Sequence, residues 1–511
     1  DMHKISETKH PEKIWKFMYS HEFDGLLKLL EADCVDVPGD YNDYDKLIGR
    51  PLFEFFNRIE YPNVFLGKDL MEFVSPGIFL DKGLEAANAS FARELIKAYK
   101  DEKPVVVLSA MGDTTDHLLE AANIAVEGKV DISGVEKLHR ETADILGIKI
   151  EAIDSLLEEL SQLLTGLSML KELTKRTRDY LVSFGERMSV RMMAAYLQNQ
   201  GIPAKFYDAW DIGMISDSNF MSAELLDEVW ENIPKHLNDY KDGKTSEIPI
   251  VTGFIAKDKK GNITTLGRGG SDLTATMIGS AMKAKEIQTW KDVDGILTAD
   301  PRVVKNARPV PEVTYEEAAE LAYFGAQVLH PRSMMPCLKS GVPVRVKNSY
   351  NIDSPGSIIV ENHSGEVPKV TAITSVKNVT LIDINSTRML GSAGFLAHVF
   401  NNFLKWGISV DVIATSEVSV SLTVNGKTDL TGLLNDLDHV ADVEVQKNKS
   451  IVTIICDADH SSAILASGFG ALAKEGINVQ MISQGASKVN ITVICDDDET
   501  NQVVNVLHTA F

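Results

Sequence analysis

The strongest constraint on the fold is an alternation of short apolar runs with amphipathic stretches between residues 77 and 350. Residues 104–109 and 248–254 are apolar runs that end in polar or glycine-containing loops, and residues 131–200 have leucines at helical spacing. Apolar runs of this kind are typical of strands buried on both faces of a parallel sheet. The pattern predicts an α/β fold with a mainly parallel sheet between helix layers, and ligands bound by loops at the strand ends.

Composition excludes several classes of protein. The 511 residues are enough for about three domains, and 44% of them are hydrophobic. The net charge of −22 disfavours nucleic acid and anionic membranes, because both require a positive face. The four cysteines form no CxxC pair, which favours reduced thiols. No apolar run approaches the ~18 residues of a transmembrane helix. We therefore expect a cytoplasmic protein.

A glycine-rich segment at residues 264–272 is the most informative motif. It follows a strand-like run and precedes a helix expected over 273–284. Glycines let the backbone approach a ligand closely, and free N–H groups at a helix start attract phosphate or carboxylate. Arg268 adds a guanidinium suited to bidentate binding of an anion, and Asp272 is suited to a metal or an ammonium group. The alternative is that Ser271 and Asp272 only cap the helix.

Three further loops have the same character. Residues 109–116 follow a strand and offer two hydroxyls, and residues 183–186 are expected to precede a helix with Glu186 in its first turn. Residues 290–302 carry acids and bases suited to a nucleotide and Mg²⁺. Each loop alone could also have a purely structural role. These roles are a helix cap at 109–116, a contact of Glu186 with the helix dipole, and a surface turn at 290–302. Together they favour one binding site, which lacks the Walker A and Rossmann glycine motifs.

The C-terminal region, residues 371–511, contains an internal repeat. Gly407 and Gly476 lie 69 residues apart, and each follows a helix and precedes a strand-like run, at 408–413 and 477–482. A polar turn and a second strand-like run follow in both copies. The repeat predicts a duplicated βαββαβ module, with chance similarity of two α/β units as the alternative.

These motifs resemble those of the aspartate kinases, which have an amino acid kinase fold followed by two ACT domains of βαββαβ type. The catalytic resemblance lies in VVVLSAMGDTTD, SFGER, TTLGRGGSD, WKDVDGILTADPR, ELAYFGAQVLHPRSM and VRVKNS, and the regulatory one in GISVDVIATSEVSVSLTV and GINVQMISQGASKVNITV. Lys291 and Gln327 are similar to the monofunctional, lysine-sensitive enzymes of plants and some bacteria. The implied domains are 77–350 (kinase), 351–370 (linker), 379–446 (first ACT domain) and 371–378 plus 447–511 (second ACT domain), after an N-terminal segment 1–76 without family counterpart.

The resemblance implies an activity. The enzyme would phosphorylate the side-chain carboxylate of L-aspartate with ATP, as the first step of lysine, threonine and methionine biosynthesis, with Mg²⁺ bound to the nucleotide and no protein-held metal. Lysine would inhibit at the ACT domains, and these would pair into a homodimer or a larger homo-oligomer. The plant branch adds the plastid stroma as an alternative location. Because the reference pKa of aspartate is about 3.9, no strong general base is required.

The resemblance also implies roles for individual residues. The catalytic residues would be Arg268, Asp272 and Glu186, and the substrate-binding residues Ser109, Thr115, Glu186, Arg268 and Ser271. The ATP-binding residues would be Gly269, Gly270, Lys291, Asp292, Asp300 and Arg302. The lysine-binding residues would be Met389, Ser392, Gly394, Leu396, Ser409, Val410, Asp411, Thr415, Ser416 and Glu417.

One motif departs from the family. Its first strand carries Lys-Phe-Gly-Gly, whose lysine neutralises the transferred phosphoryl group, and residues 77–83 lack this motif. Lys82 is a possible substitute. Either residues 1–83 supply another cation and the enzyme works, or the chain is a catalytically impaired, lysine-binding regulatory homologue. A kinase acting on glutamate is a third alternative, which the paired ACT modules and the segment 183–186 disfavour.

Overall fold

The fold is known from a computed structural model in which residues 91–511 form one compact unit. The N-terminal segment and Lys82 lie outside the residues that the structure describes. None of the described helices is both long and apolar enough to cross a membrane. The described residues are 93–511 apart from 95, 150, 292, 326–328, 350, 352, 366–368, 387–393, 458–459 and 485–488.

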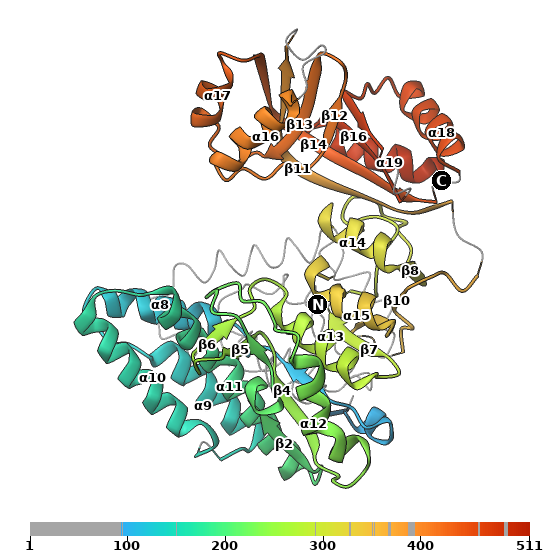
Figure 1. Ribbon diagram of the computed structural model, residues 1–511. Helices are drawn as coiled ribbons and strands as arrows, with labels where there is room; N and C mark the ends of the chain where they lie inside the picture. Colours follow the sequence, from blue (N-terminus) through green and yellow to red (C-terminus); the bar gives the residue numbers. More distant parts are fainter. Residues whose placement is uncertain are drawn as a thin grey trace, which may run out of the picture. The chain divides into compact units, whose positions relative to one another are not determined.

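The described strands up to residue 360 form three small sheets and not one continuous sheet (Figure 1). In the order β1-β4-β2 all pairs are parallel, whereas β3-β5-β6 and β7-β9-β10-β8 each include one antiparallel pair. The strands are β1 (Val106–Leu108), β2 (Ala204–Tyr207), β3 (Ile215–Ser216), β4 (Ile248–Thr252), β5 (Ile255–Asp258), β6 (Ile263–Thr265), β7 (Ile287–Lys291), β8 (Glu312–Thr314), β9 (Val344–Asn348) and β10 (Ser357–Val360).

Helices cover both faces of the β1-β4-β2 sheet. Helix α11 packs on one face, and α12 with α13 packs on the other through a buried cluster that includes Val251, Ile233 and Met277. The helices of this region are η2 (Lys100–Glu102), α8 (Thr114–Val126), α9 (Ser133–Leu146), α10 (Glu151–Leu170), α11 (Lys175–Asn199), η3 (Ala209–Ile212), α12 (Val229–Lys241), α13 (Gly270–Met282), α14 (Tyr315–Tyr323) and α15 (Pro331–Ser340).

The helical stretch expected at 131–200 is three helices. Gly147 ends α9 in the left-handed conformation, and Lys171, also at positive φ, follows the end of α10. The prediction that residues 183–186 form a loop before a helix is wrong, because they lie in the middle of α11. Glycine in a helix interior costs about 1 kcal/mol and serine less, and packing of this buried helix outweighs both.

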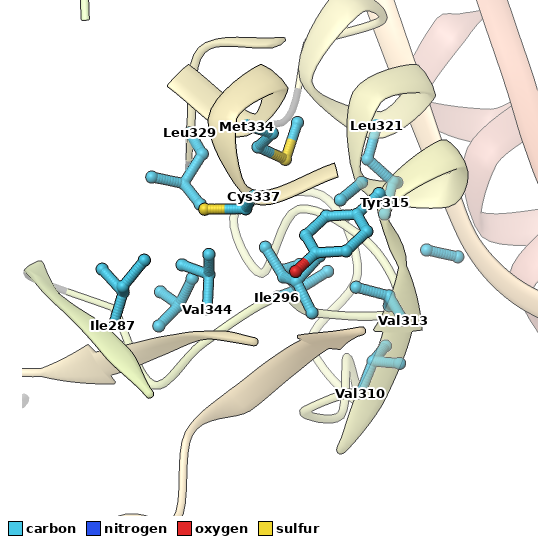
Figure 2. Packing of buried hydrophobic residues seen from close by; sticks show 14 of the residues in the cluster. Ile287, Ile296, Val310, Val313, Tyr315, Leu321, Leu329, Met334, Cys337 and Val344 are labelled. Carbon is cyan, nitrogen blue, oxygen red and sulfur yellow. The ribbon is translucent and has the colours of Figure 1, made fainter. Parts of the chain in front are cut away.

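A second core lies beneath the β7-β9-β10-β8 sheet. Tyr315 and Leu321 of α14 meet Cys337 of α15 over Val344 and Ile359 of the strands, as Figure 2 shows for most of the cluster. Fully burying an aliphatic side chain contributes roughly 1.5–3 kcal/mol. This core holds the start of α15 in place, and the candidate site depends on it.

The repeat folds as one six-stranded sheet in the order β12-β13-β11-β14-β16-β15. In each half a short edge strand pairs with a middle strand, which pairs with a long central strand. All of its strand pairs are antiparallel. Its strands are β11 (Val370–Asn385), β12 (Ile413–Thr415), β13 (Ser419–Asn425), β14 (Asp442–Cys456), β15 (Met481–Ser483) and β16 (Asn490–Asp496). Its helices are α16 (Phe395–Lys405), α17 (Thr431–Leu437), α18 (Ser461–Lys474) and α19 (Thr500–Ala510).

The two long central strands are shared between the halves. The first half of β11 pairs with residues 451–456 of β14, and its second half pairs with 442–446 and with β13. Asn378 and Asn448 lie where each long strand passes from one half to the other. Both have positive φ, a conformation that asparagine tolerates better than most residues. The edge strands β12 and β15 are shorter and begin later than the runs expected at 408–413 and 477–482.

Candidate active site and sensor

The loop after β1 meets the start of α13. Ser109 Oγ donates a hydrogen bond to Ser271 Oγ at 2.7 Å. Gly269 is the N-cap of α13 at φ 71°, and a Cβ at this position would lie 2.6 Å from Cβ of His330. A side chain here would both strain the backbone and clash. The expected pairing of the 109–116 loop with the glycine-rich segment is therefore present, and Ser271 lies in the first turn of the helix without capping it.

Glu186 is the most unusual group in this region. It is 3% exposed, its Oε1 accepts a hydrogen bond from Ala110 N at 3.3 Å, and its Oε2 has no partner among the described residues. Burial raises the pKa of Glu186 to about 7. The helix comes this close because residue 185 is glycine, where a Cβ would lie 2.7 Å from Ala110 Cβ. A buried carboxylate oxygen without a partner is suited to an ammonium group.

Asp272 and Lys291 form an ion pair beside the glycine-rich segment. Lys291 Nζ lies 3.0 and 2.9 Å from the two carboxylate oxygens of Asp272. The lysine comes from the end of β7 and the aspartate from the first turn of α13. Both side chains are partly exposed, so the pair is open to rearrangement when an anion binds. The structure thus joins the glycine-rich segment and the 290–302 loop, the first and fourth predicted loops.

Arg268 and Thr115 have no hydrogen bond or ion pair of their side chains within the described part of the chain. Arg268 is exposed, and no hydrogen bond or ion pair engages its guanidinium within the described part of the chain. Its charge is close enough to His330 to lower the pKa of that imidazole, after the larger effect of burial. Thr115 is half-buried in the first turn of α8. Both residues are therefore available to a ligand.

Asp300 and Arg302 form an ion pair in which Arg302 Nη2 lies 2.8 Å from Asp300 Oδ2, and this pairing lowers the pKa of Asp300. The neighbouring Ala299 and Val304 pack in the core beneath α18 and α19. Thr298 Oγ1 also lies 2.9 Å from His508 Nε2 of α19. Asp292 is outside the described residues.

The predicted sensor residues lie along α16 and the approach to β12. Asp411 is half-buried, and Tyr323 Oη of α14 donates a hydrogen bond to its Oδ1 at 3.3 Å. Burial raises the pKa of Asp411. Ser416 and Ser419 share a hydrogen bond at 2.8 Å, and Glu417 between them is exposed. Gly394, Leu396, Ser409 and Thr415 are also exposed and Val410 is half-buried, whereas Met389 and Ser392 lie outside the described residues.

Two side chains that contact the glycine-rich segment were not predicted. Asp179 of α11 and Arg332 of α15 both bond to the backbone at the base of the glycine-rich segment. Arg332 lies in the quoted stretch ELAYFGAQVLHPRSM, and Asp179 lies seven residues before Glu186, on the same helix face. The helical spacing was the available signal for Asp179. No comparable sequence signal marked the contacts of Arg332, which join segments far apart in the chain.

Two regions of the chain match models of known protein families. A model of the amino acid kinase family matches residues 83–348, and a model of the ACT domain matches residues 459–511. The expected fold class, an amino acid kinase fold followed by ACT modules, is thereby confirmed. Residues 1–82 lie outside both matches.

Individual relatives extend over most of the chain. The sequence is 50% identical over 436 residues to aspartokinase 3, chloroplastic, of Arabidopsis thaliana, covering 82% of this chain and 78% of that protein. The structure resembles E. coli aspartokinase III in complex with aspartate and ADP, with a TM-score of 0.66 and 31% identity over 83% of this chain and 96% of that one. It resembles the same enzyme in complex with lysine and aspartate equally, with a TM-score of 0.66 and 31% identity over 82% and 95%.

Proposed function

This chain belongs to the aspartokinase family, and we propose that its site transfers the γ-phosphoryl group of ATP to the side-chain carboxylate of L-aspartate. The observation that carries the proposal is the buried carboxylate of Glu186, of which only Oε1 has a hydrogen-bond partner among the described residues. That partner, Ala110, follows Ser109, which is bonded to Ser271 in the glycine-rich segment. The crystallised E. coli relative holds aspartate and ADP together, which supports a common site for the two substrates.

The amino acid would be held at both of its charged ends. The Oε2 atom of Glu186 accepts the ammonium group, which supplies the hydrogen bond that this buried atom lacks. The guanidinium of Arg268 binds the α-carboxylate with two parallel hydrogen bonds. Ser109, Thr115 and Ser271 offer hydroxyls between these charges. With both ends fixed, the side-chain carboxylate has one direction in which to approach the nucleotide.

The chemical step requires no general base. The side-chain carboxylate is already ionised at neutral pH, since its reference pKa is about 3.9. One of its oxygens forms a bond to the γ-phosphorus, and the bond from that phosphorus to the β–γ bridging oxygen breaks. The bridging oxygen leaves with the electron pair as part of ADP, and β-aspartyl phosphate remains. Positioning and charge neutralisation supply most of the rate in such transfers.

The phosphates would lie on the start of α13. Gly269, the N-cap of α13, lets the backbone approach a phosphate closely, and the helix N-terminus attracts negative charge. Lys291 leaves Asp272 and contacts the phosphates when the nucleotide binds. The nucleotide roles of Asp292, Asp300 and Arg302 rest on the family resemblance alone.

A magnesium ion fits this donor set only as a phosphate-bound ion. No group of three or more His, Cys, Asp or Glu side chains that suits a metal occurs among the described residues. Mg²⁺ commonly needs only one or two protein carboxylates when it binds with substrate phosphates. Asp272, released from Lys291, would hold it. The bound ion would neutralise charge on the nucleotide phosphates.

Lysine would inhibit through the first module of the repeat. Asp411 and Glu417 supply the negative charge that a lysine ammonium requires, and the hydroxyls of Thr415 and Ser416 lie beside them in sequence. The lysine complex of the E. coli relative supports this effector. The exposed edge formed by Ile413 and Val418 would pair with a second copy in a homodimer, which light scattering of the purified protein would test.

We place the enzyme in the plastid stroma, because the Arabidopsis relative is chloroplastic. This replaces the cytoplasm as the preferred location. Imaging of the natural precursor fused to a fluorescent protein would separate the two compartments.

A coupled assay with aspartate, ATP and Mg²⁺ tests the function. Turnover should be abolished by omission of aspartate, and glutamate should not replace it. Arg268→Ala should lose aspartate affinity and keep nucleotide binding. Absence of turnover in the natural chain, with lysine binding intact, would instead support a regulatory homologue without kinase activity.

A further inference from the structure

The base of the glycine-rich segment is bonded to a buried aspartate. Asp179 of α11 is 1% exposed, and its Oδ2 accepts hydrogen bonds from Met221 N and Thr265 N, both at 2.9 Å. Its Oδ1 accepts a third from Thr265 Oγ1 at 2.9 Å. The carboxylate therefore joins helix α11 to the end of β6 and to the chain near residue 221. Three charge-assisted hydrogen bonds make this a strong attachment.

An arginine holds the same two segments through their carbonyl groups. Arg332 of α15 donates from Nη1 to Leu266 O at 2.7 Å and from Nη2 to Ala223 O at 2.6 Å. The segments are also bonded directly, since Ala223 N donates to Thr265 O at 2.9 Å. His330 Nδ1 accepts from Arg332 N at 3.2 Å and fixes the start of α15. We call Asp179 and Arg332 the loop clamp.

The loop clamp connects the two groups that are proposed to hold aspartate. Asp179 and Glu186 are seven residues apart in α11 and so lie on one helix face. Leu266 precedes Arg268 by two residues, with only Gly267 between them. Any shift of α11 relative to the end of β6 therefore changes the distance from the Glu186 carboxylate to the Arg268 guanidinium. We propose that Asp179 and Arg332 are positioning residues that set this distance for the amino acid substrate.

The charges of the clamp fit this role better than a role in stability alone. No ion pair within 4.0 Å neutralises Asp179 or Arg332 in the described part of the chain, so each charge is compensated mainly by backbone groups. Buried and partly buried charges are costly when their partners are neutral. Their fork geometry, however, fixes two chain segments at once, which a neutral side chain does less rigidly.

The proposal rests on the proposed function and predicts a selective kinetic defect. Arg332→Lys, which can reach only one carbonyl, and Asp179→Asn, which places a donor against the N–H groups, should raise the KM for aspartate. We expect increases on the order of tenfold to a hundredfold, the cost of small misplacements in a binding site. The dissociation constant of ADP should change by less than about twofold, because Lys291 and the start of α13 remain in place.

A double-mutant cycle separates positioning from stability. In an Arg268→Ala background, Arg332→Lys should add no further increase in the KM for aspartate, because the clamp acts through Arg268. Arg345→Met is the control, since Arg345 pairs with Glu286 at 2.8 Å on a strand remote from these segments. Its KM for aspartate should match that of the natural enzyme. Thermal unfolding followed by circular dichroism checks that each variant is folded.

The outcomes are distinguishable. If the natural enzyme does not phosphorylate aspartate, the proposed function fails. If it does, but folded clamp variants leave the KM for aspartate unchanged, or weaken aspartate and ADP equally, the clamp proposal fails. Additive effects of Arg332→Lys and Arg268→Ala would also contradict it. Should Arg332→Lys not fold, Asp179→Asn decides the question by the same criteria.

Discussion

The catalytic site and the sensor are both proposed to hold an amino acid, yet they present their carboxylates in opposite ways. Glu186 is 3% exposed, lacks a partner on one oxygen, and has a pKa that burial raises to about 7. Asp411 is half-buried and already accepts a hydrogen bond from Tyr323, and Glu417 is exposed.

The difference in burial predicts how each site responds to its ligand. A buried charge interacts strongly, because solvent screens it little, whereas exposed charges interact weakly and depend on salt. Substrate binding should therefore depend steeply on one residue and on pH. Effector binding should be shared among several residues, each with a modest effect.

The largest expected effect is at the buried carboxylate. Glu186→Gln keeps the shape of the side chain but removes the charge that would face the substrate ammonium. We expect kcat/KM for aspartate to fall on the order of 10²–10³-fold, as for removal of one strong electrostatic contact. Steady-state assays at saturating ATP measure this. An effect below about threefold would place Glu186 outside the substrate site.

A pH profile should distinguish the two sites next. Because burial raises the pKa of Glu186 to about 7, the ionised form that binds an ammonium group is lost as the pH falls below this value. The KM for aspartate should rise about tenfold for each pH unit below 7. Glu186→Gln should flatten this dependence. A steep profile that survives in the variant would assign the titration to another group.

A smaller effect is expected at the half-buried sensor carboxylate. Asp411→Asn retains the shape and should raise the lysine concentration that gives half-inhibition by about tenfold, the effect of one hydrogen bond to a charged group. Activity without lysine should stay unchanged, which serves as the internal control. Inhibition identical to that of the natural enzyme would remove Asp411 from the sensor.

The smallest effect is expected at the exposed carboxylate. Glu417→Ala should raise the half-inhibitory lysine concentration by no more than about fivefold, because exposed ion pairs contribute at most about 1 kcal/mol. The effect should shrink further in high salt. If Glu417→Ala raised the half-inhibitory lysine concentration more than Asp411→Asn does, the comparison of buried and exposed charges would be contradicted.

Much of the catalytic site could be predicted from local sequence. The glycine-rich segment joins a strand to a helix, and its Gly269 has the positive φ that the motif requires. Ser109 and Ser271 meet because the loop after β1 reaches the first turn of α13, which follows β6 of a second sheet. In both cases a short stretch of chain carries its own structural signal.

Other features depend on contacts between distant segments and were missed. Glu186 was expected in a loop, but α11 continues through it, because Gly185 permits close packing against Ala110. Ala299 and Val304, beside Asp300 and Arg302, pack against the repeat, a contact that the local motif does not indicate, and the nucleotide roles of Asp300 and Arg302 stay predictions. Packing between segments far apart in the chain produces these contacts, and local motifs do not encode it.

The most direct test is the proton balance of aspartate binding at pH 6. If an ammonium group binds the buried carboxylate, Glu186 must lose its proton, and calorimetry in buffers of different ionisation enthalpy should show release of about 0.9 protons per aspartate. Release should vanish in Glu186→Gln and become small at pH 8. Binding of aspartate to the natural enzyme without proton release at pH 6 would contradict the account.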